Sequence, residues 1–376
     1  MATATTRIIF AGGGTGGHLY PALAVADELR RRHPEAEVTF VGGRRGLENR
    51  LVPAAGYPLR TLALSGIKGA GLVGRIRAAA AAGWAVLRCL GWMLGRRPDL
   101  VIGVGGYASG PAVLAASVLG VKTMVMEQNH FPGATNRFLA RRVDTVCLPS
   151  EAARGRLGGL GIVTGNPVRA EFAAIGEPPG ARELSVLVFG GSRGARSLNR
   201  AMSEALPDLA KLDPVPRIVH QTGEADRSEI AAVYSGHLPE GRFEVVSFID
   251  DMPARFAAAD LIVCRAGATT LAELAAAGRP AVLVPYPYAA DDHQRLNAEA
   301  VEEAGGAVTM LDRELGGARL AALLRELDGD RDRLRRMGRA ARTLARPNAT
   351  SLIAEIAGTL LKGKVAGVNE GRADVS

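Results

Sequence analysis

One pattern occurs twice in this 376-residue chain: a hydrophobic run, a glycine-rich turn and then a helical pattern. The first copy is Ile8-Ile-Phe-Ala-Gly-Gly-Gly-Thr-Gly-Gly17, and the second is Val186-Leu-Val-Phe-Gly-Gly-Ser-Arg-Gly194. Short apolar runs that alternate with longer helical patterns are typical of parallel sheets made of repeated βα units. The sequence therefore predicts an α/β protein with two Rossmann-like domains.

Ten apolar runs have the length and composition of buried strands, five in each half of the chain. In the first half they are Ile8–Ala11, Val38–Val41, Leu100–Val104, Thr123–Glu127 and Thr145–Leu148. In the second half they are Leu184–Phe189, Arg217–Gln221, Glu244–Ser247, Leu261–Cys264 and Ala281–Val284.

The predicted domain boundary lies where turn residues interrupt this pattern, at Gly165–Arg169 or in the Pro178-Pro-Gly180 segment. We place an N-terminal domain at residues 1–165 and a C-terminal domain at residues 166–362. The last helix of the C-terminal domain can pack back on the N-terminal one. The polar residues 363–376 are expected to form a disordered tail.

Charge and cysteine content narrow the class of protein. The net charge of +8 and the pI near 9.8 favour acidic partners, although no nucleic-acid recognition module is present. The three cysteines are far apart, which predicts reduced thiols in the cytosol and neither disulfides nor a zinc site. No signal peptide is expected, because the first predicted strand follows a short polar opening.

The first glycine-rich loop, Gly12–His18, contains a G-x-G-x-x-G match, which alone also fits a dinucleotide site. Such a site needs an acidic residue at the end of the second strand to bind the ribose. That strand ends in Gly42-Gly43-Arg44-Arg45, so a dehydrogenase is disfavoured, although an NADP-type variant stays open. His18, at the start of the helix, is either a catalytic base or a histidine bonded to backbone.

Two further loops follow predicted strands. Gly103–Pro111 carries Tyr107 and precedes an apolar helix, with Pro111 suited to its first turn. Gly190–Arg196 offers backbone N–H groups, the Ser192 hydroxyl and a helix N-terminus, which together suit a diphosphate.

The segment Cys264–Glu273 also carries candidate site residues. Thr269 and Thr270 can cap a helix, and Glu273 either accepts hydrogen bonds from two sugar hydroxyls or completes a capping box. No metal site is predicted: Asp328–Asp332 resembles a calcium loop, but Arg333 replaces the required glycine and Arg339 the bidentate glutamate.

Seven motifs occur in the order found in one known family, over about Ile8 to Ile356. They are Gly13–His18, Gly105–Pro111, Glu127-Gln-Asn129, Gly165–Arg169, Gly190–Arg196, Phe248–Met252 and Arg265–Glu273. Together they closely resemble the MurG family, the N-acetylglucosaminyltransferases of bacterial peptidoglycan synthesis. The resemblance implies a GT-B fold, with two Rossmann-like domains whose parallel sheets face each other across a cleft. It also implies inverting transfer of GlcNAc from UDP-GlcNAc to the C4 hydroxyl of lipid I, without metal or cofactor, giving lipid II. Lipid I is MurNAc-pentapeptide-diphospho-undecaprenol.

The same resemblance assigns roles to individual residues. On the donor side, Ser192 and Arg169 resemble the diphosphate contacts, the backbone of Ile249 the uracil contact, Glu273 the ribose ligand, and Gln294 and Asn129 further donor contacts. Ala268, Thr269, Thr270, Leu271 and Ala272 resemble the donor-binding wall. Thr15, Gly16, Gly17, His18 and Tyr107 resemble the acceptor side, with His18 as the candidate base. The chain departs from the family where Ala266 replaces a frequent serine and His293 replaces the first of two glutamines.

The segment before Arg97 has an amphipathic pattern. Its apolar residues are Leu72, Val73, Ile76, Trp84, Leu87 and Leu94, and its basic residues are Lys68, Arg75, Arg77, Arg88, Arg96 and Arg97. Arg88 disfavours a membrane span over Ala78–Gly95, which leaves a core helix or a membrane-surface helix. The resemblance favours peripheral attachment to the anionic cytoplasmic face of the cell membrane, with contacts to cell-wall synthesis and division proteins.

Three alternatives to this function stay open from the sequence. One is a GT-B glycosyltransferase with another lipid or natural-product acceptor, and another is a UDP-sugar epimerase. The third is a scaffold that binds the nucleotide sugar without turning it over.

Overall fold

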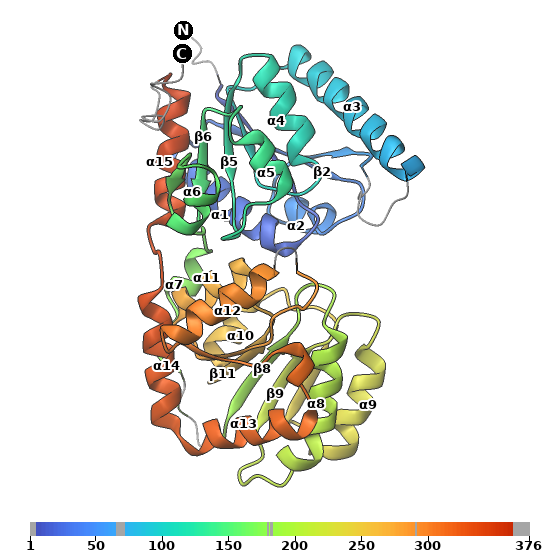
Figure 1. The fold of residues 1–376 in the computed structure, drawn as a ribbon, viewed down its shortest axis with the longest axis vertical. Coiled ribbons are helices and arrows are strands. Elements are labelled where there is room, and N and C mark those ends of the chain that lie inside the picture. Colours follow the sequence, from blue (N-terminus) through green and yellow to red (C-terminus); the bar gives the residue numbers. More distant parts are fainter. Residues whose placement is uncertain (1–4, 65–71, 179, 181–182, 290–291, 364–376) are drawn as a thin grey trace. The chain divides into compact units, whose positions relative to one another are not determined.

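The computed structural model describes residues 5–64, 72–178, 180, 183–289 and 292–363, and it divides the chain into two compact units (Figure 1). Unit 1 contains the residues up to Arg169 together with the C-terminal residues from Arg346, and unit 2 contains Ala170–Ala345. The division after Arg169 falls four residues beyond the boundary that the sequence predicts. Residues 364–376 of the expected tail lie outside the described residues.

Unit 1 is built on a seven-stranded parallel sheet with the strand order β3-β2-β1-β4-β5-β6-β7. In that order the strands are Leu59–Leu62, Glu37–Gly43, Arg7–Ala11, Leu100–Gly103, Lys122–Met126, Thr145–Leu148 and Ile162–Val163. Its helices are α1 (Gly16–Arg32), α2 (Glu48–Ala54), α3 (Leu72–Gly95), α4 (Ser109–Val118), α5 (Ala134–Leu139), α6 (Glu151–Arg156) and α15 (Ala349–Leu361).

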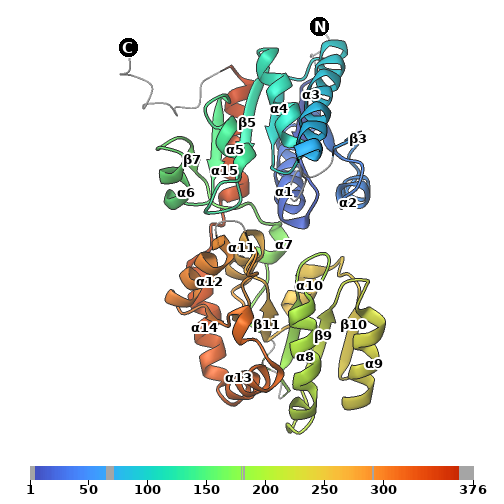
Figure 2. The same cartoon turned by 45° about the vertical axis from the view of Figure 1, so that its right-hand side comes forward.

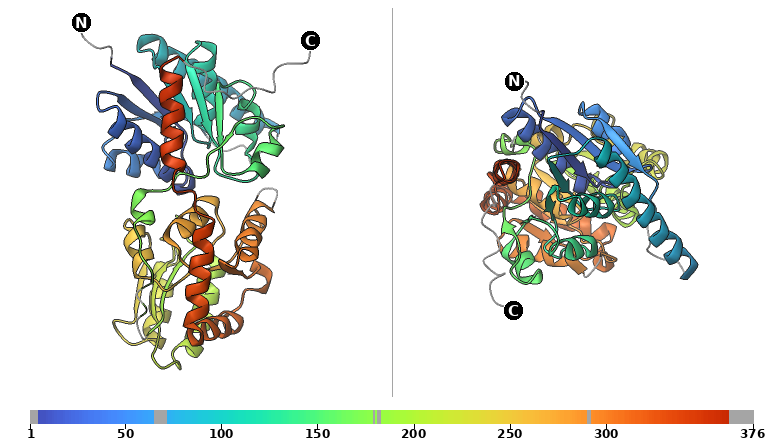
Figure 3. Two further views of the ribbon diagram at one scale, coloured as in Figure 1. Left: turned by 90° about the vertical axis from the view of Figure 1, so that its left-hand side faces the viewer. Right: turned by 90° about the horizontal axis from the view of Figure 1, so that it is seen from above.

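Both faces of this sheet are covered, as parallel sheets require. Successive side chains of a strand point to opposite faces, so Ile8 and Phe10 of β1 pack in one core and Ala11 in the other. The first core is closed by α1 and α15, and the second by α3 and α4. Figure 3 shows α15, the last helix of the chain, lying along the face of the unit 1 sheet.

Unit 2 repeats the design with a six-stranded parallel sheet in the order β10-β9-β8-β11-β12-β13 (Figure 2). In that order the strands are Phe243–Val246, Arg217–Gln221, Ser185–Phe189, Leu261–Cys264, Ala281–Leu283 and Ala307–Thr309. Its helices are α7 (Ala170–Ala173), α8 (Arg196–Leu209), α9 (Arg227–His237), α10 (Met252–Ala258), α11 (Ala268–Ala277), α12 (His293–Glu303), η2 (Asp312–Glu314), α13 (Gly317–Gly329) and α14 (Arg331–Thr343).

Each sheet has one point where the strand order changes direction. In unit 1 it lies between β1 and β4, and in unit 2 between β8 and β11. Loops that leave the carboxyl ends of two such strands diverge to opposite faces of the sheet, which opens a crevice for ligands. The fold alone therefore directs attention to the loops after these four strands.

All ten strands predicted from the sequence are confirmed to within a few residues, and so is the two-domain α/β class. The sequence reading missed β3, β7 and β13, which have two to four residues each. All three lie at sheet edges, where a strand is short and needs no continuous apolar run.

Helix α3 has two different sides. Over Arg77–Gly95 it is long and apolar enough to cross a membrane by length and composition, a test that core helices of soluble proteins also pass. Ala85, Cys89 and Met93 are buried in the core shared with α4, whereas Trp84 and Leu87 are 68% and 60% exposed. One side of α3 is therefore part of the core of unit 1. The side chains of residues 72–76, and Lys68 as a whole, lie outside the described residues.

The docking of α15 on unit 1 gives a stability prediction. Ile353 is 1% exposed in the core shared with α1, so Ile353→Ala should destabilise unit 1 by about 2–5 kcal/mol. Both tryptophans of the chain lie in α3, so tryptophan fluorescence during urea unfolding reports on unit 1. The midpoint should fall in this variant and stay unchanged in the exposed control Glu355→Ala. Equal midpoints in all three proteins would show that α15 does not support unit 1.

Candidate functional site

The loops after β1 and β4 approach each other backbone to backbone at the unit 1 crevice. The Gly13 N–H donates to the Gly105 carbonyl at 3.2 Å. A Cβ atom on Gly12 would lie 2.2 Å from that same carbonyl oxygen, and one on Gly106 would lie 2.5 Å from the Gly13 oxygen. Only glycine fits these positions, since both residues also have a positive φ. The two glycine-rich motifs thus form one structure.

His18 lies against this pair of loops. Its ring packs on Gly105, where an added Cβ would lie 2.9 Å from Nε2, and its Nδ1 lies 3.3 Å from the Thr15 hydroxyl. Burial lowers the pKa of His18, while Glu127, a hydrogen bond to the Gly13 backbone and Glu48 each act to raise it. His18 is therefore neutral at pH 7, the state in which an imidazole can accept a proton.

Glu48 of α2 provides a carboxylate that the sequence reading missed. Its Oε2 accepts the Gly14 N–H and its Oε1 the Gly43 N–H, both at 2.8 Å, and the residue is 2% exposed. A carboxylate does lie at the end of β2, where a dinucleotide site would need one to bind the ribose. It belongs to Glu48 of the next helix, however, and it accepts hydrogen bonds from backbone N–H groups. Glu48 fixes the first glycine loop to the end of β2. Three flanking glycines, Gly42, Gly43 and Gly46, leave room for it and are the signal that was available in the sequence.

Glu127 plays the same part after β5. One carboxylate oxygen accepts the backbone and side-chain N–H groups of Asn129, at 2.8 and 3.0 Å, and the other accepts from Gly133 and Asn136 at 2.9 Å. Four hydrogen bonds on a carboxylate that is 4% exposed leave the Asn129 amide one orientation. In the Glu127-Gln-Asn129 motif, Glu127 therefore fixes the orientation of the Asn129 side chain.

The remaining predicted residues of unit 1 lie around these loops. Thr15 immediately precedes α1, and Gly16 and Gly17 form its first turn. Tyr107 is 56% exposed in the loop after β4. Arg169, assigned with Ser192 to the diphosphate, belongs to unit 1, where its guanidinium lies 4.3 Å from the centre of the Tyr20 ring. Ser192 belongs to unit 2.

In unit 2 the loop after β8 joins the strand to a 14-residue helix, α8. The Gly194 N–H donates to the Gly191 carbonyl at 2.9 Å, and Gln221 of β9 holds the same carbonyl at 2.8 Å. A Cβ on Gly194 would lie 1.7 Å from the Thr222 oxygen, so the loop is fixed against the neighbouring strand end. Ser192 lies within this turn at the positive end of the helix, which suits an anion.

The loop after β11 leads into α11, and here one sequence interpretation is wrong. Gly267 is the N-cap of α11, so Thr269 and Thr270 lie inside the first turn of the helix and not at its cap position. Glu273 is therefore not the partner residue of a capping box. Ala268, Thr269 and Glu273 are buried at the crevice, while Thr270, Leu271 and Ala272 are partly exposed.

Two more candidates come from neighbouring strand ends. Ile249 follows β10, and the residue is 4% exposed. Gln294 lies in the first turn of α12, where its side-chain oxygen accepts the Tyr286 N–H at 3.0 Å. Of the two departures from the family pattern, Ala266 is fully buried and its carbonyl faces Asn297 at 3.4 Å, and His293 begins α12.

Arg265 connects the loops of unit 2 and had no role in the sequence reading. It donates to the Val284 and Pro285 carbonyls at 3.2 and 3.1 Å, to Asp312 at 2.6 Å and to the Ser197 hydroxyl at 2.7 Å. These groups come from the end of β12, from η2 and from the first turn of α8. An arginine directly after an apolar strand is the sequence signal for such a contact.

The predicted residues of unit 1 thus lie around its crevice loops, after β5 and where the chain passes to unit 2, and those of unit 2 lie around its crevice loops, after β10 and in α12. Unit 1 holds a neutral histidine, an oriented amide and an exposed tyrosine, and unit 2 holds a glycine-rich turn before a helix and a buried carboxylate. Within the described residues, no group of three or more histidine, cysteine, aspartate or glutamate side chains is arranged to hold a metal ion.

Known proteins resemble both halves of the chain. Residues 8–148 match the N-terminal domain of glycosyltransferase family 28, and residues 185–354 match its C-terminal domain. A Myxococcus xanthus protein is 44% identical over 354 residues, covering 93% of this chain and 92% of its own length. A Citrifermentans bemidjiense protein is 46% identical over 357 residues, covering 92% and 98%. Both are named UDP-N-acetylglucosamine--N-acetylmuramyl-(pentapeptide) pyrophosphoryl-undecaprenol N-acetylglucosamine transferase.

Solved structures agree. The crystal structure of Acinetobacter baumannii MurG has a TM-score of 0.70 and 32% identity, over 93% of this chain and 98% of that one. A Neisseria meningitidis UDP-GlcNAc 2-epimerase bound to UDP-GlcNAc has a TM-score of 0.67 but 15% identity, over 95% and 100%, and so shares the fold alone.

The fold and the two domain matches define a glycosyltransferase of family 28 with the GT-B architecture. Within that class, the chain belongs to the MurG family of N-acetylglucosaminyltransferases, as its full-length relatives show.

The position of Glu48 predicts how His18 titrates. Glu48→Gln keeps one oxygen for a backbone N–H but removes the charge that raises the pKa of His18. The pKa of His18 should therefore fall further below the usual histidine value. Histidine NMR titration measures it, with the His18 signal assigned among the six histidines by its loss in His18→Gln.

The matched control for this titration is Glu151→Gln, which removes a carboxylate that is 74% exposed. It should leave the His18 titration unchanged. If His18 has the same pKa in Glu48→Gln as in the wild type, the charge of Glu48 does not affect the pKa of His18.

Proposed function

We propose that the chain transfers GlcNAc from UDP-GlcNAc to the C4 hydroxyl of MurNAc-pentapeptide-diphospho-undecaprenol with inversion at the anomeric carbon. The observation that carries the proposal is that relatives of this named activity match over more than nine-tenths of the chain. Every residue that the family resemblance assigns lies in or beside a crevice loop, in the segment joining the two units, or after a neighbouring strand end.

The donor is assigned to unit 2. The turn around Ser192 and the N-terminus of α8 take the diphosphate, because backbone N–H groups and the helix dipole stabilise negative charge there. Glu273 accepts hydrogen bonds from the ribose hydroxyls beside Ala268–Ala272, the Ile249 backbone binds uracil, and Gln294 binds a sugar hydroxyl. Arg169 and Asn129 of unit 1 complete the donor contacts.

The acceptor is assigned to unit 1, with Thr15, Gly16, Gly17 and Tyr107 around His18. Neutral His18 removes the proton from the C4 hydroxyl as the oxygen attacks the anomeric carbon of GlcNAc. The bond from that carbon to the β-phosphate oxygen breaks, and UDP leaves with the bonding electrons. One displacement inverts the anomeric configuration, and it needs one base and a stabilised leaving group.

These roles predict that two substitutions have different effects. His18→Ala should lower kcat by about 10²–10⁴-fold, because it removes the base, and should leave UDP-GlcNAc binding unchanged. Glu273→Gln should weaken UDP-GlcNAc binding by roughly tenfold or more, because a charge-assisted hydrogen bond contributes about 1.5–3 kcal/mol. Both are measured with labelled UDP-GlcNAc and a lipid I analogue in the presence of EDTA, together with calorimetric donor binding.

Glu224→Gln, an exposed position in unit 2, is the matched control and should behave as the wild type. If His18→Ala kept full kcat, His18 would be an acceptor contact rather than the base. The same assay tests the alternatives: donor epimerised without acceptor points to an epimerase, and binding without turnover points to a scaffold. Transfer to another acceptor alone points to a different GT-B enzyme.

We further propose that α3 attaches the enzyme to the anionic cytoplasmic face of the cell membrane, where the lipid acceptor is found and where cell-wall synthesis and division proteins are partners. Trp84, Leu87 and Leu94 are 68%, 60% and 72% exposed on a helix that also carries Arg88. Exposed apolar side chains beside cations favour the surface of an anionic membrane. The buried side of α3 packs in unit 1, so the helix lies on the membrane rather than across it.

The attachment is tested by Trp84→Ser/Leu87→Ser. This variant should lose most of its binding to phosphatidylglycerol vesicles in sedimentation, while transfer to a soluble lipid I analogue stays within about twofold of the wild type, because the substituted side chains lie in α3 rather than in a crevice loop. Leu344→Ser removes an apolar side chain that is 40% exposed in unit 2 and should leave vesicle binding unchanged. Equal sedimentation of all three proteins would remove α3 as the attachment site.

A further inference from the structure

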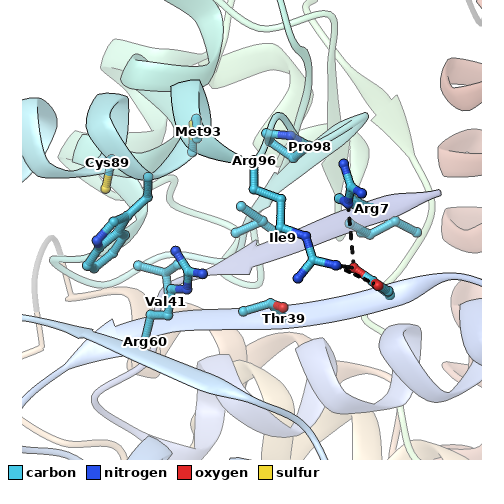
Figure 4. Close-up of a pocket in the computed structure, with 12 residues that line it drawn as sticks. Arg7, Ile9, Thr39, Val41, Arg60, Cys89, Met93, Arg96 and Pro98 are labelled. Carbon is cyan, nitrogen blue, oxygen red and sulfur yellow. Dashed lines mark hydrogen bonds and ion pairs between the residues drawn. The ribbon is translucent and has the colours of Figure 1, made fainter. Parts of the chain in front are cut away.

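A pocket lies in unit 1 between α3 and the edge of the sheet, and no role has been given to it so far (Figure 4). Its floor consists of alternate residues of neighbouring strands, namely Ile9 of β1 and Thr39 and Val41 of β2. Because strand side chains alternate between faces, these residues share the face that α3 covers. Trp92, Met93 and Cys89 of α3 form the wall.

The pocket runs along the strands on the face that α3 covers, from Arg7 and Glu37 at one end to Val41 and Arg60 at the other. Arg7 and Glu37, which line it, are the first residues of β1 and β2, whereas the glycine loops follow the last residues of β1 and β4. Helix α1, which carries His18, packs on the opposite face of the sheet from α3, so the pocket and the histidine lie on different faces.

Three arginines line this pocket against one carboxylate. Glu37 accepts from Arg96 Nη2 through both oxygens at 2.7 Å, and its Oε2 lies 3.5 Å from Arg7 Nε. That Nε is buried and has no hydrogen-bond partner within the described residues. One carboxylate therefore faces two guanidinium groups, and its hydrogen bonds at 2.7 Å come from Nη2 of Arg96.

Arg60 of β3 is the third cation. Its guanidinium lies 5.4 Å from the centre of the Trp92 ring, and in the described part of the chain no carboxylate is within 4 Å of it. Figure 4 shows Arg60 entering from the strands and Arg96 from the position that follows α3, with Thr39 below them. The lining thus carries three positive charges, one negative charge and a hydroxyl.

Phosphate is the ligand that fits this lining. Guanidinium groups bind phosphate oxygens through paired N–H donors, and the Thr39 hydroxyl adds a further donor. A carboxylate is flat, whereas a phosphate carries its negative charge on tetrahedrally arranged oxygens that can face cations entering from opposite sides.

We propose that this pocket binds the phosphate group of a phosphomonoester or phosphodiester between Arg60 and Arg96, above Thr39. The source of the phosphate is either a soluble phosphate ester or an anionic lipid headgroup, and the two sources share this chemistry. The site is separate from the proposed donor and acceptor residues and does not depend on the transfer reaction.

The experiment uses the full chain with saturating UDP, so that the proposed diphosphate turn of unit 2 is occupied. Binding of sn-glycerol 3-phosphate is measured by calorimetry, and binding to phosphatidylcholine vesicles with and without phosphatidylglycerol by sedimentation. The variant is Arg60→Gln/Arg96→Gln, both at exposed positions. The matched control, Arg77→Gln/Arg97→Gln, removes the same charge from exposed positions in and just after α3 outside the pocket.

The pocket variant should bind at least about tenfold more weakly than the control, because it loses two charge-assisted contacts. A loss for glycerol 3-phosphate identifies a soluble ester, and a loss confined to phosphatidylglycerol vesicles identifies a lipid headgroup. The proposal is overturned if wild type and pocket variant bind every probe equally, or if the control loses as much binding as the pocket variant. Neither result bears on GlcNAc transfer, which is assayed separately.

Discussion

The close contact between the β1 and β4 loops is the constraint on which the rest of unit 1 depends. Gly12 lies so close to Gly105, and Gly106 so close to Gly13, that neither Gly12 nor Gly106 has room for a Cβ atom. Because the backbones touch, His18 at the start of α1 rests directly on the second loop, and one histidine ring is fixed by two separate stretches of chain. A bulkier residue at Gly105 would displace the imidazole itself, since the built Cβ lies 2.8 Å from its Cδ2. The close contact between the two loops therefore also fixes the histidine that we propose as the base.

Buried carboxylates then hold these loops in place. Glu48 and Glu127 make six hydrogen bonds between them to backbone and amide N–H groups, and neither is more than 4% exposed. Both also act on the pKa of His18, opposing the effect of burial. The histidine thus stays neutral without its pKa falling as far as burial alone would take it. Unit 2 uses a cation for the same purpose, since Arg265 connects the end of β12, η2 and the first turn of α8.

The two units use one design for different chemistry. Each has a crevice where the strand order changes direction, a glycine-rich turn after the first central strand and a helix beginning at that turn. In unit 1 the turn leads into a helix with a histidine in its first turn, which suits proton transfer. In unit 2 it leads into a 14-residue helix without acidic residues in its first turn, which suits an anion. The duplication explains why similar loops recur in the sequence and why they are not interchangeable.

The sequence by itself determined the two-domain α/β class, ten of the strands and the loops that carry the proposed site, because buried parallel strands are continuous apolar runs and crevice loops must be rich in glycine. The sequence did not predict the edge strands β3, β7 and β13, because these segments are strands through pairing with a neighbour and not through their local composition. Tertiary structure alone decided which carboxylate meets the end of β2: Glu48 arrives from a helix, and its partners Gly14 and Gly43 are 34 and 5 residues away. It also decided that Thr269 and Thr270 lie inside α11, and that Arg7, Arg60 and Arg96 line one pocket. Such side-chain contacts depend on which strands are neighbours and on which face of the sheet α3 covers. The spacing of residues in the sequence predicts neither of these.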